Sequence, residues 1–467
     1  MPSFSERLTI FRLMAVMALM LCGGPSFAEE AAQGPGRMKM EAVEFRLANG
    51  LQVVLIADSR APVVTHSIWY KVGATDDPPH SHGLAHFLEH MMFKGTDTYP
   101  AGVFNQVVSR IGGVQNAVTT ADYTYYYQIV PKVHLSQMMA MEADRMANLR
   151  MNENEVVSER TVILQERRAS IDDDYSRRLY IKAYEALYAG HPNNTDLIGS
   201  PEEILAFSRE DALAFYRKHY VPGNAVLVVA GDVTEAELRQ LAENTYGRIP
   251  ARDVPTERAV LRPVQPVSQH RVSITDAHVT TDGLFVIFRL PGLTQMELRE
   301  SVALSILAEI LGSDTGRLRQ KLVLTGIARD AGANFDAGFT GRFSVVANST
   351  RQGGMSQVES GIAAIIAELL EKGVTQDELD LERADVLAGV IYQTDYQSLL
   401  ASRYGSALTL SQKVDFVDQW MNNIKAVTVD DINAVARKYF VEDMKVIGEA
   451  WPATAASAAP PAKGEAQ

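Results

Sequence analysis

Two histidines and a glutamate near residue 90 have the spacing of a metal site. His86 and His90 are four residues apart, and Glu89 directly precedes the second histidine. At about 100° per residue, a helix places the three side chains on one face, with the histidines roughly 6 Å apart along its axis. Two neutral imidazoles can then bind one zinc ion while the carboxylate reaches a water on that ion. The order H-x-x-E-H inverts the commoner H-E-x-x-H zinc motif.

A catalytic zinc also needs a third protein ligand and an open position for water. The segment 154–170 has helical apolar spacing, and the helix around it carries Glu155, Glu159 and Glu166. Glu159 and Glu166 share a helix face because they are seven residues apart. Chemistry alone does not choose among the three glutamates, and all three can equally form a solvated face paired with neighbouring arginines.

The other histidines make weaker ligand candidates. His82 precedes His86 by four residues, but His82 and His90 would lie about 12 Å apart along a helix, too far for one ion. A pair of His82 and His86 would lack a glutamate between them. No histidine follows His278, so the C-terminal half cannot hold a second site of this kind.

The composition predicts a globular protein that does not bind nucleic acid. The chain has 467 residues, 46% hydrophobic and 22% charged, which is enough for two to four domains. Its formal net charge of -13 argues against a nucleic-acid partner, because phosphate contacts need clustered lysines and arginines.

Residues 1–28 have the pattern of an export signal. Two arginines precede ten consecutive apolar residues, and Ser26-Phe27-Ala28 offers a small-x-small cleavage site. Ten apolar residues are too few for a membrane span, which takes about 20, so we expect no stable span after processing; a retained anchor is the alternative. Cys22 is the only cysteine, so the mature protein would have no thiolate ligand. The sequence predicts an exported protein, most simply in the periplasm of a Gram-negative bacterium.

A faint internal repeat predicts two homologous domains. Segments 216–231 and 436–448 each join an aromatic and basic helix end to an apolar strand, at an offset of about 220 residues. Such a long period indicates duplicated domains rather than a solenoid. Strands and helices without strict alternation predict an α+β fold, with a mostly antiparallel sheet and helices packed on it in each domain.

The residues around the histidines resemble a known family. The segment 83–91 (GLAHFLEHM), followed by FKGT at 93–96, resembles the signature of the pitrilysin/insulysin zinc peptidases, closest to the short branch that includes mitochondrial processing peptidase. In that family the third ligand is the last glutamate of E-R-x-V-x-x-x-E, which occurs here at 159–166. NAVT at 116–119, YVPGNA at 220–225 and the duplicated halves also match.

The resemblance implies a site and a chemistry. It implies His86, His90 and Glu166 as the ligands of one zinc ion per chain, Glu89 as the general base and Glu159 as a support behind the ligands. Zinc lowers the pKa of its water from 15.7 to about 7, and Glu89 would take the proton as that water attacks a peptide carbonyl.

The resemblance also implies how substrate binds. The strand with Asn116 and Ala117 is expected to bind an extended peptide main chain to main chain, the alternative being an ordinary core strand. The second domain is expected to face the first like the other half of a clamshell. Arg342 and Tyr404 are candidates for its substrate contacts, beside the alternative of ordinary surface or core residues.

The predicted function is therefore that of a zinc-dependent endopeptidase acting on peptides or unfolded segments. Short-branch relatives commonly work as pairs, so we expect a homodimer or a heterodimer with a related chain. The alternatives are a zinc-bearing subunit of a two-chain peptidase and a non-catalytic assembly subunit. Non-catalytic relatives usually have a degraded metal motif, whereas this chain keeps both histidines and both glutamates.

These expectations divide the chain into segments. They are a signal peptide (1–28), a flexible lead-in (29–40), a catalytic zinc-peptidase domain (41–250), a proline-containing hinge linker (251–268), a homologous inactive domain (269–450) and a disordered tail (451–467). Strands are predicted at 51–57, 63–72, 226–230 and 284–290, and helices at 133–149, 154–170, 203–220, 296–311 and 355–370.

Overall fold

The described strands form two β-sheets. The structure is a computed structural model and describes residues 42–453 apart from 190, 192–195, 256–265 and 351–353. The first sheet contains β1 (Ala42–Arg46), β2 (Gln52–Ala57), β3 (Val63–Tyr70), β4 (Val114–Thr119), β5 (Thr124–Pro131) and β6 (Ala225–Gly231). The second sheet contains β7 (Arg271–Asp276), β8 (Gly283–Pro291), β9 (Ala328–Ala337), β10 (Thr340–Ser349) and β11 (Lys445–Pro452).

The two sheets share one topology. The first has the order β1-β2-β6-β3-β5-β4 and the second the order β7-β11-β8-β10-β9. In each sheet one pair is parallel, β2 with β6 and β7 with β11, and the remaining pairs are antiparallel. Aligning the two orders leaves only β1 without a counterpart. This match confirms the predicted pair of homologous α+β domains with mostly antiparallel sheets.

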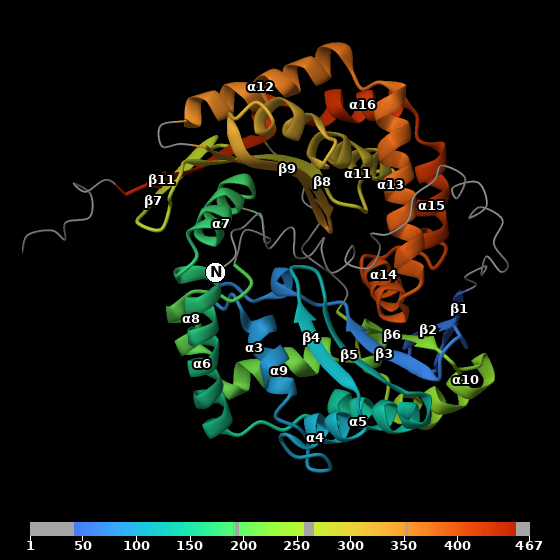
Figure 1. The fold of residues 1–467 in the computed structure, drawn as a ribbon. Helices are drawn as coiled ribbons and strands as arrows, with labels where there is room; N and C mark the ends of the chain where they lie inside the picture. The colour runs from blue at the N-terminus through green and yellow to red at the C-terminus, as the bar shows by residue number, and fades with distance from the viewer. Residues whose placement is uncertain (1–41, 190, 192–195, 256–265, 351–353, 454–467) are drawn as a thin grey trace, which may run out of the picture. The chain divides into compact units, whose positions relative to one another are not determined.

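Helices pack on both sheets (Figure 1). Those before the linker are α3 (Leu84–Met92), α4 (Val103–Arg110), α5 (Leu135–Asn148), α6 (Glu153–Arg167), α7 (Tyr175–Leu187), α8 (Pro201–Ala206), α9 (Arg209–His219) and α10 (Glu235–Asn244). Those after it are α11 (Leu298–Gly312), α12 (Met355–Lys372), α13 (Gln376–Thr394), α14 (Gln397–Thr409), α15 (Phe416–Ala426) and α16 (Val429–Tyr439). The repeat seen in the sequence corresponds to α9 with β6 and α16 with β11.

Two helices lie on the sheet of the other half. Helix α7 contacts β7 and β11 of the second sheet, and α14 contacts β3 and β6 of the first (Figure 1). Helix α14 can lie close to β3 because Gly405 has no side chain. A Cβ at this position would overlap the indole of Trp69. The boundaries 41–250 and 269–450 remain a prediction, but this exchange means that a cut at the linker would strip each sheet of one helix.

Two predicted elements are wrong. The predicted helix at 203–220 is two helices, because Ser208 caps α9: its hydroxyl accepts the backbone N–H of Asp211, whose carboxylate bonds back to Ser208. The predicted tail begins too early, since Trp451 and Pro452 pair in parallel with β7 as the end of β11. Proline is tolerated there because the pairing of β11 with β8 ends at Ala450, so Pro452 has a partner strand on one side only.

Other predicted segments fall outside the described residues. These are the signal peptide, the lead-in, most of the linker and residues 454–467. Among the helices that the structure describes, none combines the length and apolar character needed to cross a bilayer.

Candidate metal centre

Helix α3 carries three of the predicted site residues. Its apolar face is held by packing in the core, and its first residues are held by hydrogen bonds. Its apolar side chains are buried in the core of the first half; they are Leu84, Phe87, Leu88, Met91 and Met92. The carboxylate of Asp77 accepts the backbone N–H groups of Gly83 at 2.7 Å and Ala85 at 2.8 Å. These bonds satisfy donors that a helix start leaves unpaired, so they hold the end of α3 that precedes His86.

Helix α6 supplies the third predicted ligand. It begins at a capping box, in which Asn152 accepts the N–H of Glu155 and the Glu155 carboxylate accepts the N–H of Asn152. Glu155 is therefore engaged at the helix start. Helix α6 packs against α3, and Glu159 and Glu166 both reach the histidines.

The two histidines and Glu166 converge on one point. Nε2 of His86 lies 3.6 Å from Oε1 of Glu166, and Nε2 of His90 lies 3.3 Å from Oε2 of Glu166. One donor atom from each residue lies within 4.8 Å of the others. Zinc with bonds of about 2.0–2.1 Å holds tetrahedral ligand atoms about 3.4 Å apart. The three residues therefore fit a zinc ion.

Glu159 supports His90 from behind. Its Oε1 lies 2.9 Å from Nδ1 of His90, and its other oxygen forms an ion pair with Lys94. Burial raises the pKa of Glu159, but the bonds to His90 and Lys94 outweigh burial and lower it. An ionised carboxylate on Nδ1 leaves Nε2 of His90 free to face a metal.

The charges at the site suit a cation. Burial, together with the charge of His90, lowers the pKa of His86 to about 4, so this ring is neutral near pH 7. Burial also disfavours charge on His90, but its bonds to Glu159 and Glu166 raise its pKa to about 9. The hydrogen bond with His90 lowers the pKa of Glu166. In the metal-free chain a proton on His90 thus balances the carboxylates, and a bound cation would replace it.

Glu89 lies beside this cluster as a partly buried carboxylate. Its Oε2 accepts the hydroxyl of Thr119, the last residue of β4, at 2.5 Å. Burial raises the pKa of Glu89 despite this bond. A carboxylate with raised proton affinity is suited to accept a proton during a reaction.

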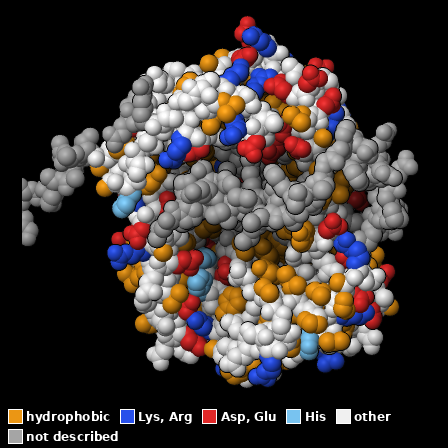
Figure 2. Space-filling model, in the orientation of Figure 1, with side chains coloured by type: hydrophobic (Ala, Val, Ile, Leu, Met, Phe, Trp, Pro, Cys, Tyr) orange, Lys and Arg blue, Asp and Glu red, His pale blue; other side chains and the backbone are white. Residues whose placement is uncertain are grey.

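Strand β4 is an edge strand of the first sheet. The backbone N–H of Ala117 bonds to the side-chain oxygen of Asn116 at 2.9 Å, so this donor is directed away from β5. Asn116 is exposed and Ala117 is buried. Figure 2 shows histidine and acidic side chains at the surface over α3 and α6, with hydrophobic side chains over the neighbouring β4 and β5.

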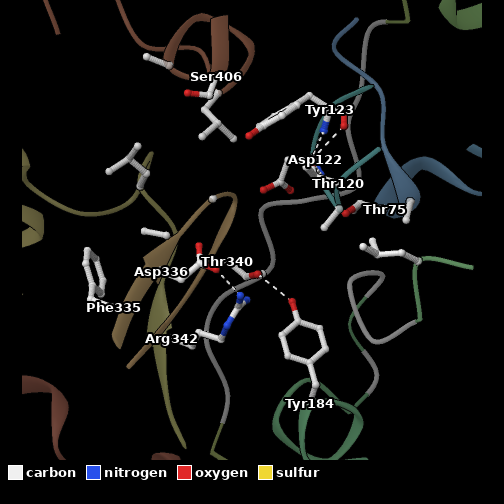
Figure 3. A pocket seen from close by; sticks show the side chains of 18 of the residues that line it. Thr75, Thr120, Asp122, Tyr123, Tyr184, Phe335, Asp336, Thr340, Arg342 and Ser406 are labelled. Atoms are coloured by element: carbon white, nitrogen blue, oxygen red, sulfur yellow. Dashed lines mark hydrogen bonds and ion pairs between the residues drawn. The ribbon is translucent and has the colours of Figure 1, made fainter. Parts of the chain in front are cut away.

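The remaining candidates lie elsewhere. His82 precedes α3, and its Nδ1 lies 2.6 Å from Oε1 of Glu203, outside the cluster. Arg342 in β10 pairs with Asp336 and lines a cavity of about 640 Å³ between the two sheets (Figure 3). Tyr404 in α14 is only 1% exposed and does not line that cavity.

Sequence reasoning left three contributors unassigned. Lys94 and Thr119 stand inside the segments FKGT and NAVT, but nothing in their spacing gave them a role. Asp77 lies in an irregular segment with no recognisable pattern. Their roles depend on contacts between residues far apart in the chain.

Comparison with known proteins gives consistent matches. Residues 52–200 match the family described as Insulinase (Peptidase family M16), and residues 206–385 match the Peptidase M16 inactive domain. Zinc protease PqqE of Helicobacter pylori is 28% identical over 400 residues, covering 84% of this chain and 89% of that protein.

Two crystal structures are similar in fold. A protease from Helicobacter pylori has a TM-score of 0.81 and 25% identity, covering 88% of this chain and 100% of that one. The periplasmic protease PqqL from Escherichia coli has a TM-score of 0.75 and 21% identity, covering 91% of this chain and 49% of that one.

Proposed function

This chain belongs to peptidase family M16, the insulinase family, and we propose that it is a zinc-dependent endopeptidase that cleaves peptides or unfolded segments. The observation that carries the proposal is the convergence of His86, His90 and Glu166 with Glu89 on the same helix as the histidines. Together these four groups supply three metal ligands and one proton acceptor, the set that hydrolysis by a zinc-bound water requires.

The residues divide the chemical work. His86, His90 and Glu166 would hold one zinc ion per chain, which when bound activates water at neutral pH and polarises a carbonyl. Glu89 accepts the proton of the attacking water and passes it to the departing amine. Thr119 donates its hydroxyl to Oε2 of Glu89, and we assign the transferred proton to the other oxygen, Oε1.

Substrate binding is assigned to the edge of β4. A peptide paired with this edge would offer a carbonyl to the N–H of Ala117, replacing the side chain of Asn116. Recognition through the main chain requires an extended segment and little side-chain identity. The surface next to the cluster is apolar over β4 and β5, which suits a strand with hydrophobic side chains.

A second candidate is a zinc-bearing subunit of a two-chain peptidase, either a homodimer or a heterodimer with a related chain. It is favoured by the exposure of the histidine and acidic side chains in Figure 2, since a second chain would enclose them.

PqqL is named as a periplasmic protease, and we extend this location to the present chain on the basis of the export pattern at 1–28.

The test is metal analysis of the purified protein together with hydrolysis of a quenched fluorescent peptide. One zinc per chain is expected, with hydrolysis abolished by a chelator and restored by zinc. Size-exclusion chromatography with and without a related chain separates the one-chain and two-chain forms. Protein that lacks zinc, or that cleaves equally well with the chelator present, contradicts the proposal.

A further inference from the structure

Two turns from opposite halves of the chain meet at Asp122. This residue lies in the turn between β4 and β5, and its Oδ2 accepts the backbone N–H of Phe339 at 3.1 Å. Phe339 and Gly338 form the turn between β9 and β10. A Cβ on Gly338 would overlap Oδ2 of Asp122, and its three nearest atoms all belong to that carboxylate. Asp122 thus fills a space that exists only because residue 338 is glycine.

The side chain of Thr119, at the start of the same turn, connects the turn to Glu89 of α3. Thr119 lies three residues before Asp122 and donates its hydroxyl to Glu89 at 2.5 Å. Displacing the turn would therefore displace the partner of Glu89.

A second connection runs through the backbone. The carbonyls of Thr120 and Ala121 accept the N–H groups of Ala74 at 3.0 Å and Thr75 at 2.9 Å. That segment continues to Asp77, which caps the start of α3. The turn is thus held between the second half on one side and the supports of α3 on the other.

Figure 3 shows the cavity that Asp122 lines, with residues of both halves around it. Thr120, Asp122 and Tyr123 lie on one side, and Phe335, Asp336, Thr340 and Arg342 of the second half lie on the other. Asp122 and Gly338, which meet at the contact between the two turns, both line this cavity.

We propose that Asp122 is a positioning residue through which the second half holds the β4–β5 turn, and with it Thr119 and Glu89, in the arrangement that hydrolysis requires. The effect on Glu89 rests on the proposed function. The second half, whose described residues contain no metal cluster, thereby contributes to the chemistry by positioning the general base.

The halves have other ties, so a variant at this contact is expected to fold. The hydroxyl of Tyr188 donates to the carbonyl of Gly341 at 2.6 Å, and Arg60 pairs with Asp395 at 2.9 Å. The exchanged helices α7 and α14 join the halves independently. Loss of the contact should therefore lower the rate of hydrolysis without unfolding the protein.

The test uses four variants and one matched control. Asp122→Ala removes the acceptor, Asp122→Asn keeps an oxygen that can accept the N–H of Phe339, and Gly338→Ala drives a methyl group into the carboxylate. The fourth combines Asp122→Ala with Gly338→Ala. Gly332→Ala is the control, because a Cβ on this glycine of β9 would meet nothing within 4 Å.

The readouts are kcat, KM, bound zinc, the melting temperature and hydrogen exchange of residues 119–123. Asp122→Ala and Gly338→Ala should each lower kcat by about tenfold or more, with KM little changed and zinc retained, because misplacement of catalytic groups by about 1 Å can cost 10²-fold. Asp122→Asn should restore most of kcat, and Gly332→Ala should match the wild type. The double variant should be no worse than Asp122→Ala alone, because the methyl group then meets no carboxylate.

Exchange at 119–123 should quicken in Asp122→Ala and Gly338→Ala but not in the control. A Gly338→Ala protein with wild-type kcat overturns the proposal. The proposal also fails if the losses of kcat in the two single variants add up in the double variant. It fails as well if kcat falls only as far as the bound zinc or the fraction of folded protein falls. If wild-type protein with full zinc cleaves no peptide, the proposed function fails instead. The positioning role of Asp122 is then judged by hydrogen exchange alone, and unchanged exchange in Gly338→Ala contradicts it.

Discussion

Nδ1 of His90 lies 2.9 Å from Oε1 of Glu159, while Nε2 of the same ring faces Glu166 at 3.3 Å. A carboxylate on the far nitrogen fixes the ring orientation and raises its basicity toward a metal. Glu159→Ala should weaken zinc binding by about 10–100-fold. Competition with a chromophoric chelator measures this affinity. Glu153→Ala is the control, since Glu153 is exposed on the same helix, and equal zinc affinity in both variants would count against the support role.

The choice of ligands predicts which histidines retain the metal. His86→Ala should lose most bound zinc, because it removes one of three converging donors. His82→Ala should keep a full complement, because its ring bonds to Glu203 outside the cluster. Metal analysis after dialysis against zinc-free buffer distinguishes them. Zinc loss in His82→Ala with retention in His86→Ala would reverse the assignment.

Pairing of substrate with β4 predicts a pattern along the peptide. Successive main-chain N–H groups of an extended strand point to opposite edges, so only alternate ones can bond to β4. In a series of peptides with one N-methylated amide each, cleavage should fall sharply at alternate positions and persist at those between. A series with uniform rates would show that main-chain pairing does not bind the substrate.

The buried His66 predicts how stability depends on pH. Its ring bonds to Gln128 at 2.6 Å and Tyr246 at 3.0 Å, and burial lowers its pKa from the ordinary 6.5. Below about pH 6.5 the unfolded chain therefore binds a proton that the folded chain does not, so stability falls as the pH falls. Denaturant unfolding of chelator-treated protein at pH 7.5, 6.0 and 5.0 measures this. His66→Gln should lose less stability than the wild type over that range, and parallel losses would refute the assignment.

The site residues on α3 could be predicted because the pattern that reveals them lies within one short segment. The spacing of His86, Glu89 and His90 sets a shared face as soon as the segment is helical. The third ligand could not be chosen in this way, because Glu155, Glu159 and Glu166 lie on one helix and only the crossing of α6 over α3 decides which of them meets the histidines. The family resemblance supplied that choice.

The organisation of the two halves was only partly predictable. The repeat indicated duplicated domains because it preserves a helix followed by a strand. It could not indicate that α7 and α14 lie on the opposite sheets, since an apolar stripe shows that a helix buries a face but not against what. The contacts of Asp77 and Asp122 likewise join residues brought together only by the fold.

The central claim is tested most directly by the rate of peptide hydrolysis by Glu89→Gln protein whose zinc content has been measured. The substitution keeps the size and one hydrogen-bonding oxygen for Thr119 but removes the carboxylate that accepts the proton. The account predicts a full complement of zinc and a rate lower by about 10²–10⁴-fold. Glu89→Gln protein that holds zinc and cleaves peptide at the wild-type rate would contradict it.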